Sequence, residues 1–262
     1  MPVIKLLKKI RNFLKRFLGK ILPKSYHVFF SDKNGFLIEI IRNELNRLYY
    51  SKADEEMKRF NREKLWGSET AAKWHAQKRK EGRSKAFLKF RTPLVFQISK
   101  LTGLHTICEI GTGNGMFLEY LSEQVPNIKR FVGIDLCKPQ ILENREIYKN
   151  TKLEFIYGEV TDWINTCENG TIFVSDGTFE YFTQKELQEL VDFIYAKVNP
   201  TAIAIAEPTN LNLATEIISK PRKNIAYSHN YLYLFSKYQV VYQQIESVNK
   251  ICKEVIMVVK NT

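Results

Sequence analysis

Thr106-Ile-Cys-Glu-Ile-Gly-Thr-Gly-Asn-Gly-Met-Phe-Leu-Glu-Tyr-Leu121 is the stretch that decides the fold. It begins with a short apolar run, continues with three glycines at a spacing of two, and ends with apolar residues at helical spacing. It therefore predicts a strand, a tight turn and a helix. Gly111, Gly113 and Gly115 let the backbone turn sharply and approach a ligand closely, and the helix N-terminus offers free N–H groups. The dinucleotide fingerprint fails, because it needs glycine at position 116, where the chain has Met.

Two acidic residues follow at positions that extend this pattern. The next apolar run, 130–135, ends in Asp135, twenty residues beyond Gly115. A Rossmann-like unit places there the acid that binds both ribose hydroxyls. A third run, 153–159, ends in Glu159 and is followed by Val160. The order of strand, glycine loop, helix, strand with Asp, and strand with Glu predicts a nucleoside-containing ligand.

The motif Glu109-x-Gly111-x-Gly113-x-Gly115 resembles the S-adenosylmethionine (SAM) loop of class I methyltransferases. The resemblance implies that SAM is the cofactor and lies over this loop. It also implies that Asp135 binds the ribose, that Glu159 holds the adenine amino group, and that the Val160 N–H contacts the ring.

The rest of the core alternates between strand and helix patterns, which predicts a doubly wound α/β fold of Rossmann-like type with a mostly parallel seven-stranded sheet. In the resembled family the sheet ends in a C-terminal hairpin with one antiparallel strand at its edge. The predicted strands are 106–111, 130–135, 153–157, 171–176, 201–207, 240–245 and 254–260, and the predicted helices are 114–125, 138–149 and 183–197. The predicted units are a basic helix (1–24), a linker (25–36), a helical lid (37–103) and the methyltransferase core (104–262).

Composition narrows the class of protein further. The chain has 262 residues, 44% of them hydrophobic and 13% aromatic, which argues against general disorder. Its four cysteines are scattered without a CxxC pair, so neither a metal site nor a disulfide framework is predicted. A reducing, cytoplasmic compartment fits this pattern best.

The net charge of +12 is concentrated at the N-terminus, where residues 1–31 contain eight Lys or Arg and no acid. Apolar residues recur at helical spacing over residues 3–22, with the cations between them. This pattern predicts an amphipathic helix on the inner face of an anionic membrane, with too many charges to span it. Packing on the protein's own domain or on another subunit, as in a homo-oligomer, stays open. Nucleic acid is the least favoured partner.

The segment 70–91 is helical in pattern and strongly basic. In the resembled family, helices just before the glycine loop fold over the cofactor as a lid, and a cation there can pair with the methionine carboxylate. Trp66, Trp74 and Arg91 are the lid candidates, and Arg91 is the predicted carboxylate partner.

Candidate catalytic residues follow the fourth and fifth core strands, whose ends face the predicted cofactor site. Asp176, Glu180, Glu207 and His229 are the predicted bases for an acceptor hydroxyl. His229 lies in the aromatic segment 227–233, whose composition suits a sugar. An ordinary packing role for His229 and the tyrosines stays open.

Two short elements of the chain resemble the sugar O-methyltransferases of bacterial surface-polysaccharide clusters: Phe179-Glu180-Tyr181-Phe182 and Ser228-His229-Asn230-Tyr231. This resemblance implies O-methylation of a sugar hydroxyl in a glycan or glycolipid intermediate at the membrane surface. The alternatives are a quinone or lipid head group as acceptor, or a SAM-binding protein without catalysis.

Overall fold

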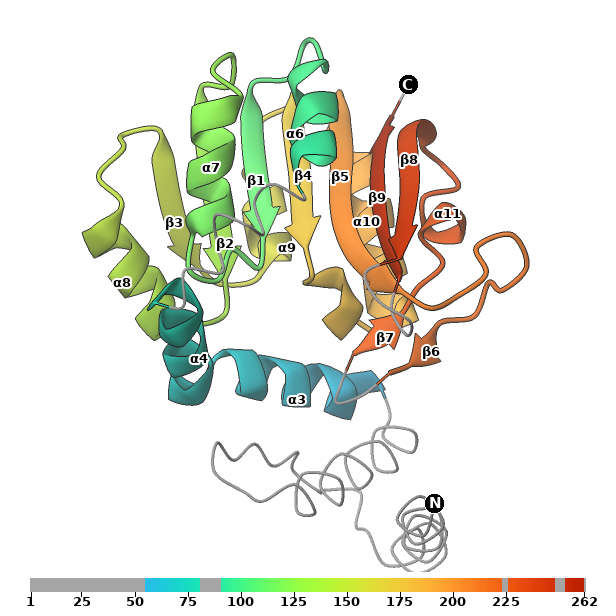
Figure 1. Ribbon diagram of the computed structural model, residues 1–262, viewed down its shortest axis with the longest axis horizontal. Helices are drawn as coiled ribbons and strands as arrows, with labels where there is room; N and C mark the ends of the chain where they lie inside the picture. Colours follow the sequence, from blue (N-terminus) through green and yellow to red (C-terminus); the bar gives the residue numbers. More distant parts are fainter. Residues whose placement is uncertain (1–54, 81–90, 223–225, 248–252, 262) are drawn as a thin grey trace, which may run out of the picture.

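The computed structural model describes residues 55–80, 91–222, 226–247 and 253–261, and the predicted N-terminal helix (3–22) and linker (25–36) lie outside them. The described residues form one seven-stranded sheet (Figure 1). In spatial order its strands are β3 (Leu153–Tyr157), β2 (Arg130–Asp135), β1 (Thr106–Ile110), β4 (Thr171–Asp176), β5 (Thr201–Thr209), β9 (Lys253–Lys260) and β8 (Gln239–Ser247). The five strands from β3 to β5 are parallel. β9 is antiparallel to both of its neighbours, so the antiparallel strand lies one position inside the edge, which β8 forms.

Helices cover both faces of the sheet (Figure 1). One face packs under α6 (Thr92–Ser99), α7 (Met116–Gln124) and α8 (Lys138–Ile147), and the other under α9 (Val160–Ile164), α10 (Gln184–Lys197) and α11 (Tyr231–Leu234). Each face has its own apolar core, with Phe131 and Leu118 fully buried in the first and Phe173 and Ile194 in the second. The doubly wound fold predicted from the sequence is confirmed.

Two further helices, α3 (Glu55–Trp66) and α4 (Glu69–Lys80), lie across the carboxyl ends of the parallel strands (Figure 1). Both helices fall within residues 37–103, the predicted lid, of which 37–54 and 81–90 lie outside the described residues. A short 3-10 helix, Phe179–Tyr181, follows β4, and a small ladder joins β6 (Lys220–Pro221) to β7 (Tyr227–Ser228). None of the helices in the described ranges is long and apolar enough to cross a membrane.

Candidate functional site

A cavity of about 170 Å³ lies at the carboxyl ends of β1, β2 and β4, beneath α3 and α4. The strand ends and the loops after them form its floor, and the two helices form its cover. It is lined by Arg62, Trp66, His75, Ile110, Gly111, Ile134, Asp135, Leu136, Gly158, Glu159, Val160, Asp176, Gly177, Thr178, Tyr181 and Phe182. Four of the predicted cofactor residues, Gly111, Asp135, Glu159 and Val160, therefore meet in one place, as the sequence predicts. Ligands of open α/β sheets bind at this edge.

The glycine loop is shaped by backbone conformation and by close neighbours. Gly111, Gly113 and Gly115 have φ angles of 72°, 50° and 74°, a region that side chains disfavour. A Cβ atom on Gly111 would lie 2.3 Å from the Thr178 hydroxyl oxygen, and one on Gly113 would lie 2.8 Å from the His75 ring. The first two glycines thus allow Thr178 and the lid residue His75 to approach the loop, which the spacing of glycines alone does not reveal.

Asp135 anchors the glycine loop as well as lining the cavity. Its carboxylate accepts hydrogen bonds from the N–H groups of Gly113 and Cys137, both at 2.8 Å, and the residue is 9% exposed. Each carboxylate oxygen can accept a second bond. Asp135 can therefore hold the loop and still receive a pair of ligand hydroxyls, the role that the sequence predicts for it.

Glu159 is the N-cap residue of α9, and Val160 is the first residue of that helix. The Glu159 carboxylate oxygen Oε1 is buried and has no hydrogen-bond partner among the described residues. Burial raises the pKa of Glu159, and the nearby Arg62 opposes this shift. A buried acceptor of this kind fits a ligand that brings its own N–H donor, such as the amino group of adenine.

Glu109 lies beneath the loop and does not line the cavity. It is 3% exposed and accepts a hydrogen bond of 2.6 Å from the Thr112 hydroxyl. Burial raises the pKa of Glu109 well above its usual value. In this geometry Glu109 supports the turn that follows β1, while its predicted contact with the cofactor stays a prediction.

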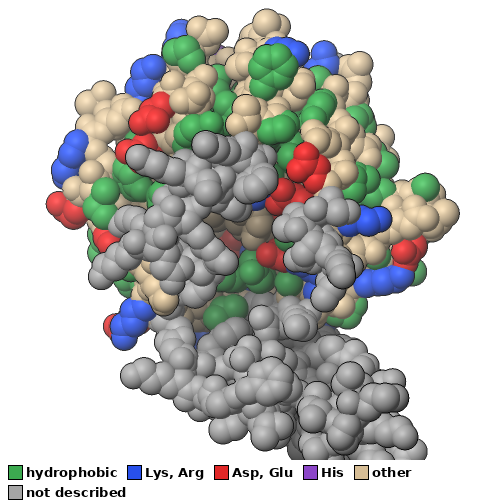
Figure 2. All heavy atoms as spheres, viewed as in Figure 1, with side chains coloured by type: hydrophobic (Ala, Val, Ile, Leu, Met, Phe, Trp, Pro, Cys, Tyr) green, Lys and Arg blue, Asp and Glu red, His purple; other side chains and the backbone are tan. Residues whose placement is uncertain are grey.

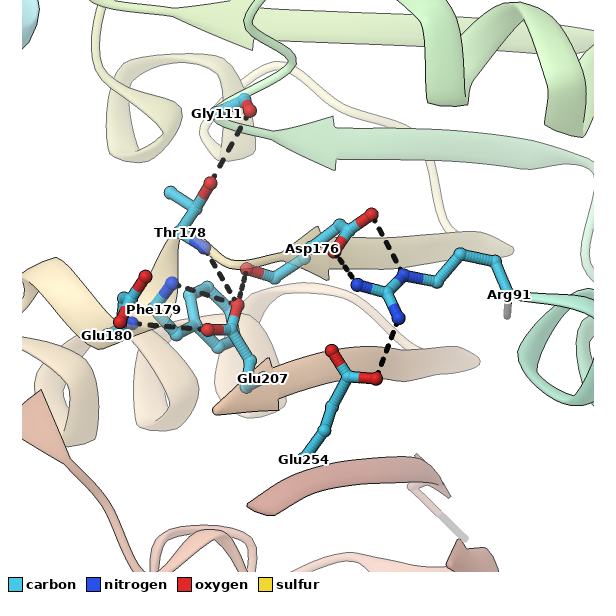
Figure 3. A network of polar contacts seen from close by, with 9 residues as sticks. Arg91, Gly111, Asp176, Thr178, Phe179, Glu180, Glu207 and Glu254 are labelled. Carbon is cyan, nitrogen blue, oxygen red and sulfur yellow. Dashed lines mark hydrogen bonds and ion pairs between the residues drawn. The ribbon is translucent and has the colours of Figure 1, made fainter. Parts of the chain in front are cut away.

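Arg91, the predicted partner of the methionine carboxylate, binds two protein carboxylates (Figure 3). Its Nη2 and Nε donate to Asp176 at 2.7 and 3.1 Å, and its Nη1 donates to Glu254 at 2.8 Å. Arg91 is 3% exposed and is not among the residues that line the cavity. The guanidinium ties the start of α6 to the end of β4 and the start of β9, and its predicted contact with the methionine carboxylate stays a prediction. The side chain of Trp74 lies outside the described part of the chain, whereas Trp66 lines the cavity.

Glu207, a predicted catalytic base, is fully buried below the loop that follows β4 (Figure 3). Its Oε1 accepts from the Ser175 hydroxyl at 2.6 Å and from the N–H groups of Thr178 and Phe179 at 2.9 and 3.0 Å. Its Oε2 accepts from the Glu180 N–H at 3.3 Å. Burial raises the pKa of Glu207 to about 8, although these hydrogen bonds oppose the shift. The structure therefore gives Glu207 a positioning role for the loop that lines the cavity.

His229, the other main candidate base, is also fully buried outside the cavity. Its Nε2 lies 3.1 Å from the Phe179 carbonyl oxygen and its Nδ1 lies 2.7 Å from the Ser219 hydroxyl. Burial lowers the pKa of His229 to about 4, so the ring is neutral near pH 7. Because both ring nitrogens have protein partners, this geometry assigns His229 to packing between Tyr227 and Tyr231, the alternative that the sequence left open.

The two remaining predicted bases differ in their access to the cavity. Glu180 forms an ion pair with Arg222 and does not line the cavity. Asp176 does line it, next to Gly177 and Thr178. Of the four predicted side chains, Asp176 alone is therefore placed to meet an acceptor in the described structure.

Sequence reasoning missed Arg62 and His75, which reach the cavity from the lid. Trp66 packs edge-on against Tyr181 at 4.8 Å between ring centroids and lies 6.0 Å from the His75 ring. Local sequence spacing does not reveal the contact between Trp66 and Tyr181, because it joins α3 to a segment far along the chain. The helical pattern of the lid was the only available signal.

Comparison with known proteins agrees with this geometry. Residues 107–201 match a family described as a methyltransferase domain. The N-methyltransferase NodS from Bradyrhizobium japonicum WM9 has a similar structure, with a TM-score of 0.53 and 15% identity over 68% of this chain and 97% of that chain. NodS in complex with S-adenosyl-L-homocysteine gives a TM-score of 0.50 and 14% identity over 66% of this chain and 86% of that chain.

No curated protein matches the chain in sequence. Similarity at these levels of identity establishes the fold, and the family match adds the type of domain. The fold and the family match both support S-adenosylmethionine as the cofactor. The presence of Asp135 and Glu159 in the lining of the cavity agrees with this cofactor. Residues 107–201 are therefore similar to methyltransferase domains, and the sheet that contains them has the Rossmann-like fold of the solved methyltransferases.

Proposed function

We propose that the protein is a SAM-dependent methyltransferase that acts on a sugar hydroxyl of a glycan or glycolipid intermediate at a membrane surface. The observation that carries the methyltransferase assignment is the meeting of Gly111, Asp135, Glu159 and Val160 in one covered cavity at the carboxyl edge of the sheet. These residues lie at or just after the carboxyl ends of three separate strands, β1, β2 and β3.

The residues fit the cofactor as follows. Asp135 would receive the ribose hydroxyls, Glu159 would accept from the adenine amino group, and the glycine loop would hold the methionine part. When bound, SAM supplies an electrophilic methyl group. The protein contributes alignment and the exclusion of water, because Arg62 and Trp66 of α3 and His75 of α4 line the cavity. Alignment of the reacting groups can supply much of the catalysis of such a transfer.

Asp176 is the residue that we assign to the acceptor hydroxyl. Its two oxygens accept N–H bonds from Arg91, which fixes the orientation of the carboxylate at the cavity wall. A carboxylate oxygen has room for a second donor. Asp176 can therefore accept a hydrogen bond from the acceptor hydroxyl and take its proton while the oxygen gains the methyl group.

The sugar acceptor is supported by the resemblance in the sequence and by the aromatic wall of the cavity. Trp66 and Tyr181 offer apolar ring surfaces beside the polar groups of Asp176 and Thr178. The segment 227–233, which first suggested a sugar, contributes less, because Tyr227, His229 and Tyr231 are buried away from the cavity.

The membrane setting rests on the sequence of residues 3–22, whose cations and apolar residues are arranged as in interfacial helices. On the face seen in Figure 2, the Lys and Arg side chains of the described residues are spread along the outline and do not form one block. We therefore propose a cytoplasmic protein that binds the inner membrane face through its N-terminus.

The test is a screen of the full-length protein with labelled SAM. We expect methyl transfer to sugar or glycolipid acceptors. Binding of S-adenosyl-L-homocysteine is measured separately by calorimetry. Transfer only to a quinone or a lipid head group would replace the sugar assignment. Binding without transfer to any of these acceptors would favour a non-catalytic protein, and absence of binding would refute the proposed function.

A further inference from the structure

Arg62 of α3 lies between two carboxylates at one end of the cavity. It is 5% exposed, and its Nη2 is 3.7 Å from Oε1 of Glu159 and 3.5 Å from Oε1 of Glu186. The centre of its guanidinium lies 4.1 Å from the centroid of the Phe182 ring. Glu159 lines the cavity, whereas Glu186 of α10 lies behind it and lines only a neighbouring hollow.

This group of charges is unusually short of hydrogen bonds. Among the described residues, Arg62 Nε, Glu159 Oε1 and Glu186 Oε1 are all buried without a hydrogen-bond partner. Buried polar groups normally have partners, so three such atoms around one guanidinium indicate a missing donor or acceptor. One cation shared by two carboxylates leaves room for a ligand that supplies the second donor.

We propose that Arg62 is a positioning residue for the purine end of the cofactor. When the exocyclic amino group binds, Arg62 gives up its contact with Glu159 and pairs with Glu186. The amino group then donates to Glu159, and Arg62 pairs with Glu186 alone while it stays on the Phe182 ring. Two one-to-one pairs replace the shared arrangement. The inference rests on the proposed function and adds Arg62 and Glu186 to the site, although Glu186 touches no cofactor.

Glu186→Gln isolates this role because it leaves the helix start intact. Glu186 Oε2 accepts from the Thr183 N–H at 2.8 Å, and the Thr183 hydroxyl accepts from the Glu186 N–H at 3.3 Å, which forms a capping box. Glutamine serves equally well in this motif. Its amide NH₂ then takes the place of Oε1 and faces Arg62 with a donor. Arg62 is left with Glu159 as its only carboxylate and competes with the amino group for it.

The experiment is calorimetric titration of the full-length protein with S-adenosyl-L-homocysteine. We expect Glu186→Gln to weaken binding about tenfold, which corresponds to about 1.4 kcal/mol. The effect should disappear when Arg62→Met is also present, because the competing cation is then gone. The matched control is Glu189→Gln, one turn along α10 in the same hollow, whose carboxylate is exposed and pairs with Lys185 at 3.8 Å. We expect this control to bind as the wild type does.

Equal affinities of the wild type and Glu186→Gln would overturn the inference. So would a loss of affinity from Glu186→Gln that is as large in the Arg62→Met protein as in the wild type. Glu186→Asp, which withdraws the carboxylate from Arg62 by one methylene, provides the same test if the glutamine variant does not fold. If the wild type binds S-adenosyl-L-homocysteine and the variants bind it with the same affinity, only the role of Arg62 is refuted. A wild-type protein that does not bind refutes the proposed function and this inference together.

Discussion

Replacement of Glu207 by glutamine should change how the stability of the protein depends on pH. The carboxyl group is fully buried, and its pKa is raised from 4.5 to about 8. Between these values the folded state binds a proton that the unfolded state has released. The contribution of Glu207 to the unfolding free energy is therefore complete below pH 4.5 and is lost as the pH rises through 8.

The magnitude follows from the size of the window. One pKa unit corresponds to 1.36 kcal/mol, so raising the pH from 5 to 7.5 should remove about 3 kcal/mol of the stability that Glu207 provides. Glutamine cannot titrate. Its amide oxygen can keep the bonds to Ser175, Thr178 and Phe179, and its NH₂ group faces only the Glu180 N–H, the longest of the four contacts at 3.3 Å.

Urea unfolding of the wild type and of Glu207→Gln, at half-unit steps from pH 5 to 8, measures this difference. The wild type should lose its advantage over the variant by about 3 kcal/mol between pH 5 and 7.5. Other titrating groups are present in both proteins and cancel in the comparison. A difference that stays constant across the range would show that Glu207 is not protonated in the folded state, and the reasoning would fail.

Further predictions concern the cofactor, the buried arginine, the buried histidine and the N-terminus. Asp135→Ala should weaken S-adenosyl-L-homocysteine binding by about 1.5–3 kcal/mol in calorimetry, because it removes a charged acceptor of ligand hydroxyls; unchanged affinity in the folded variant would contradict the ribose assignment. Arg91→Met should destabilise the protein by about 3–5 kcal/mol in urea unfolding, because Asp176 and Glu254 lose their buried cation; a loss below 1 kcal/mol would be inconsistent with this pairing. His229→Gln should keep turnover per folded molecule within about tenfold of the wild type, whereas removal of a true general base costs about 10²–10⁴-fold. Deletion of residues 1–24 should abolish co-sedimentation with anionic vesicles and leave S-adenosyl-L-homocysteine affinity unchanged, and binding of the full-length protein should weaken as salt rises; equal binding to neutral vesicles would remove the electrostatic argument.

The fold and the cofactor end of the site could be predicted because their signals are local. The glycine loop, Asp135 and Glu159 each follow an apolar run, and parallel strands bring such positions to the same edge. The sequence therefore predicted which loops meet in the cavity. It did not predict that Gly111 and Gly113 also make room for Thr178 and His75, because these contacts depend on the packing of the lid.

The acceptor side was harder to predict because polar residues in cores and in active sites look alike in a sequence. Glu207 follows the expected strand, but its carboxylate binds backbone N–H groups of the neighbouring loop. His229 lies among aromatic residues, as a sugar-binding histidine would, yet it is fully buried. Only burial and hydrogen-bond partners separate the two cases, and neither can be read from spacing.

The contacts of Arg91 also bear on the order in which the chain is made. Asp176 lies 85 residues after Arg91, and Glu254 lies 163 residues after it. A ribosome therefore releases the arginine long before either carboxylate, and the second carboxylate arrives only with β9. Until Asp176 has been made, the growing polypeptide holds a cation whose burial would be costly, and until Glu254 has been made that cation has only one of its two carboxylates. The Arg91 contacts at the wall of the cavity that carries Asp176 are therefore complete only after Glu254 has been made, so a nascent chain that stops short of Glu254 should be more open to chaperones and proteases.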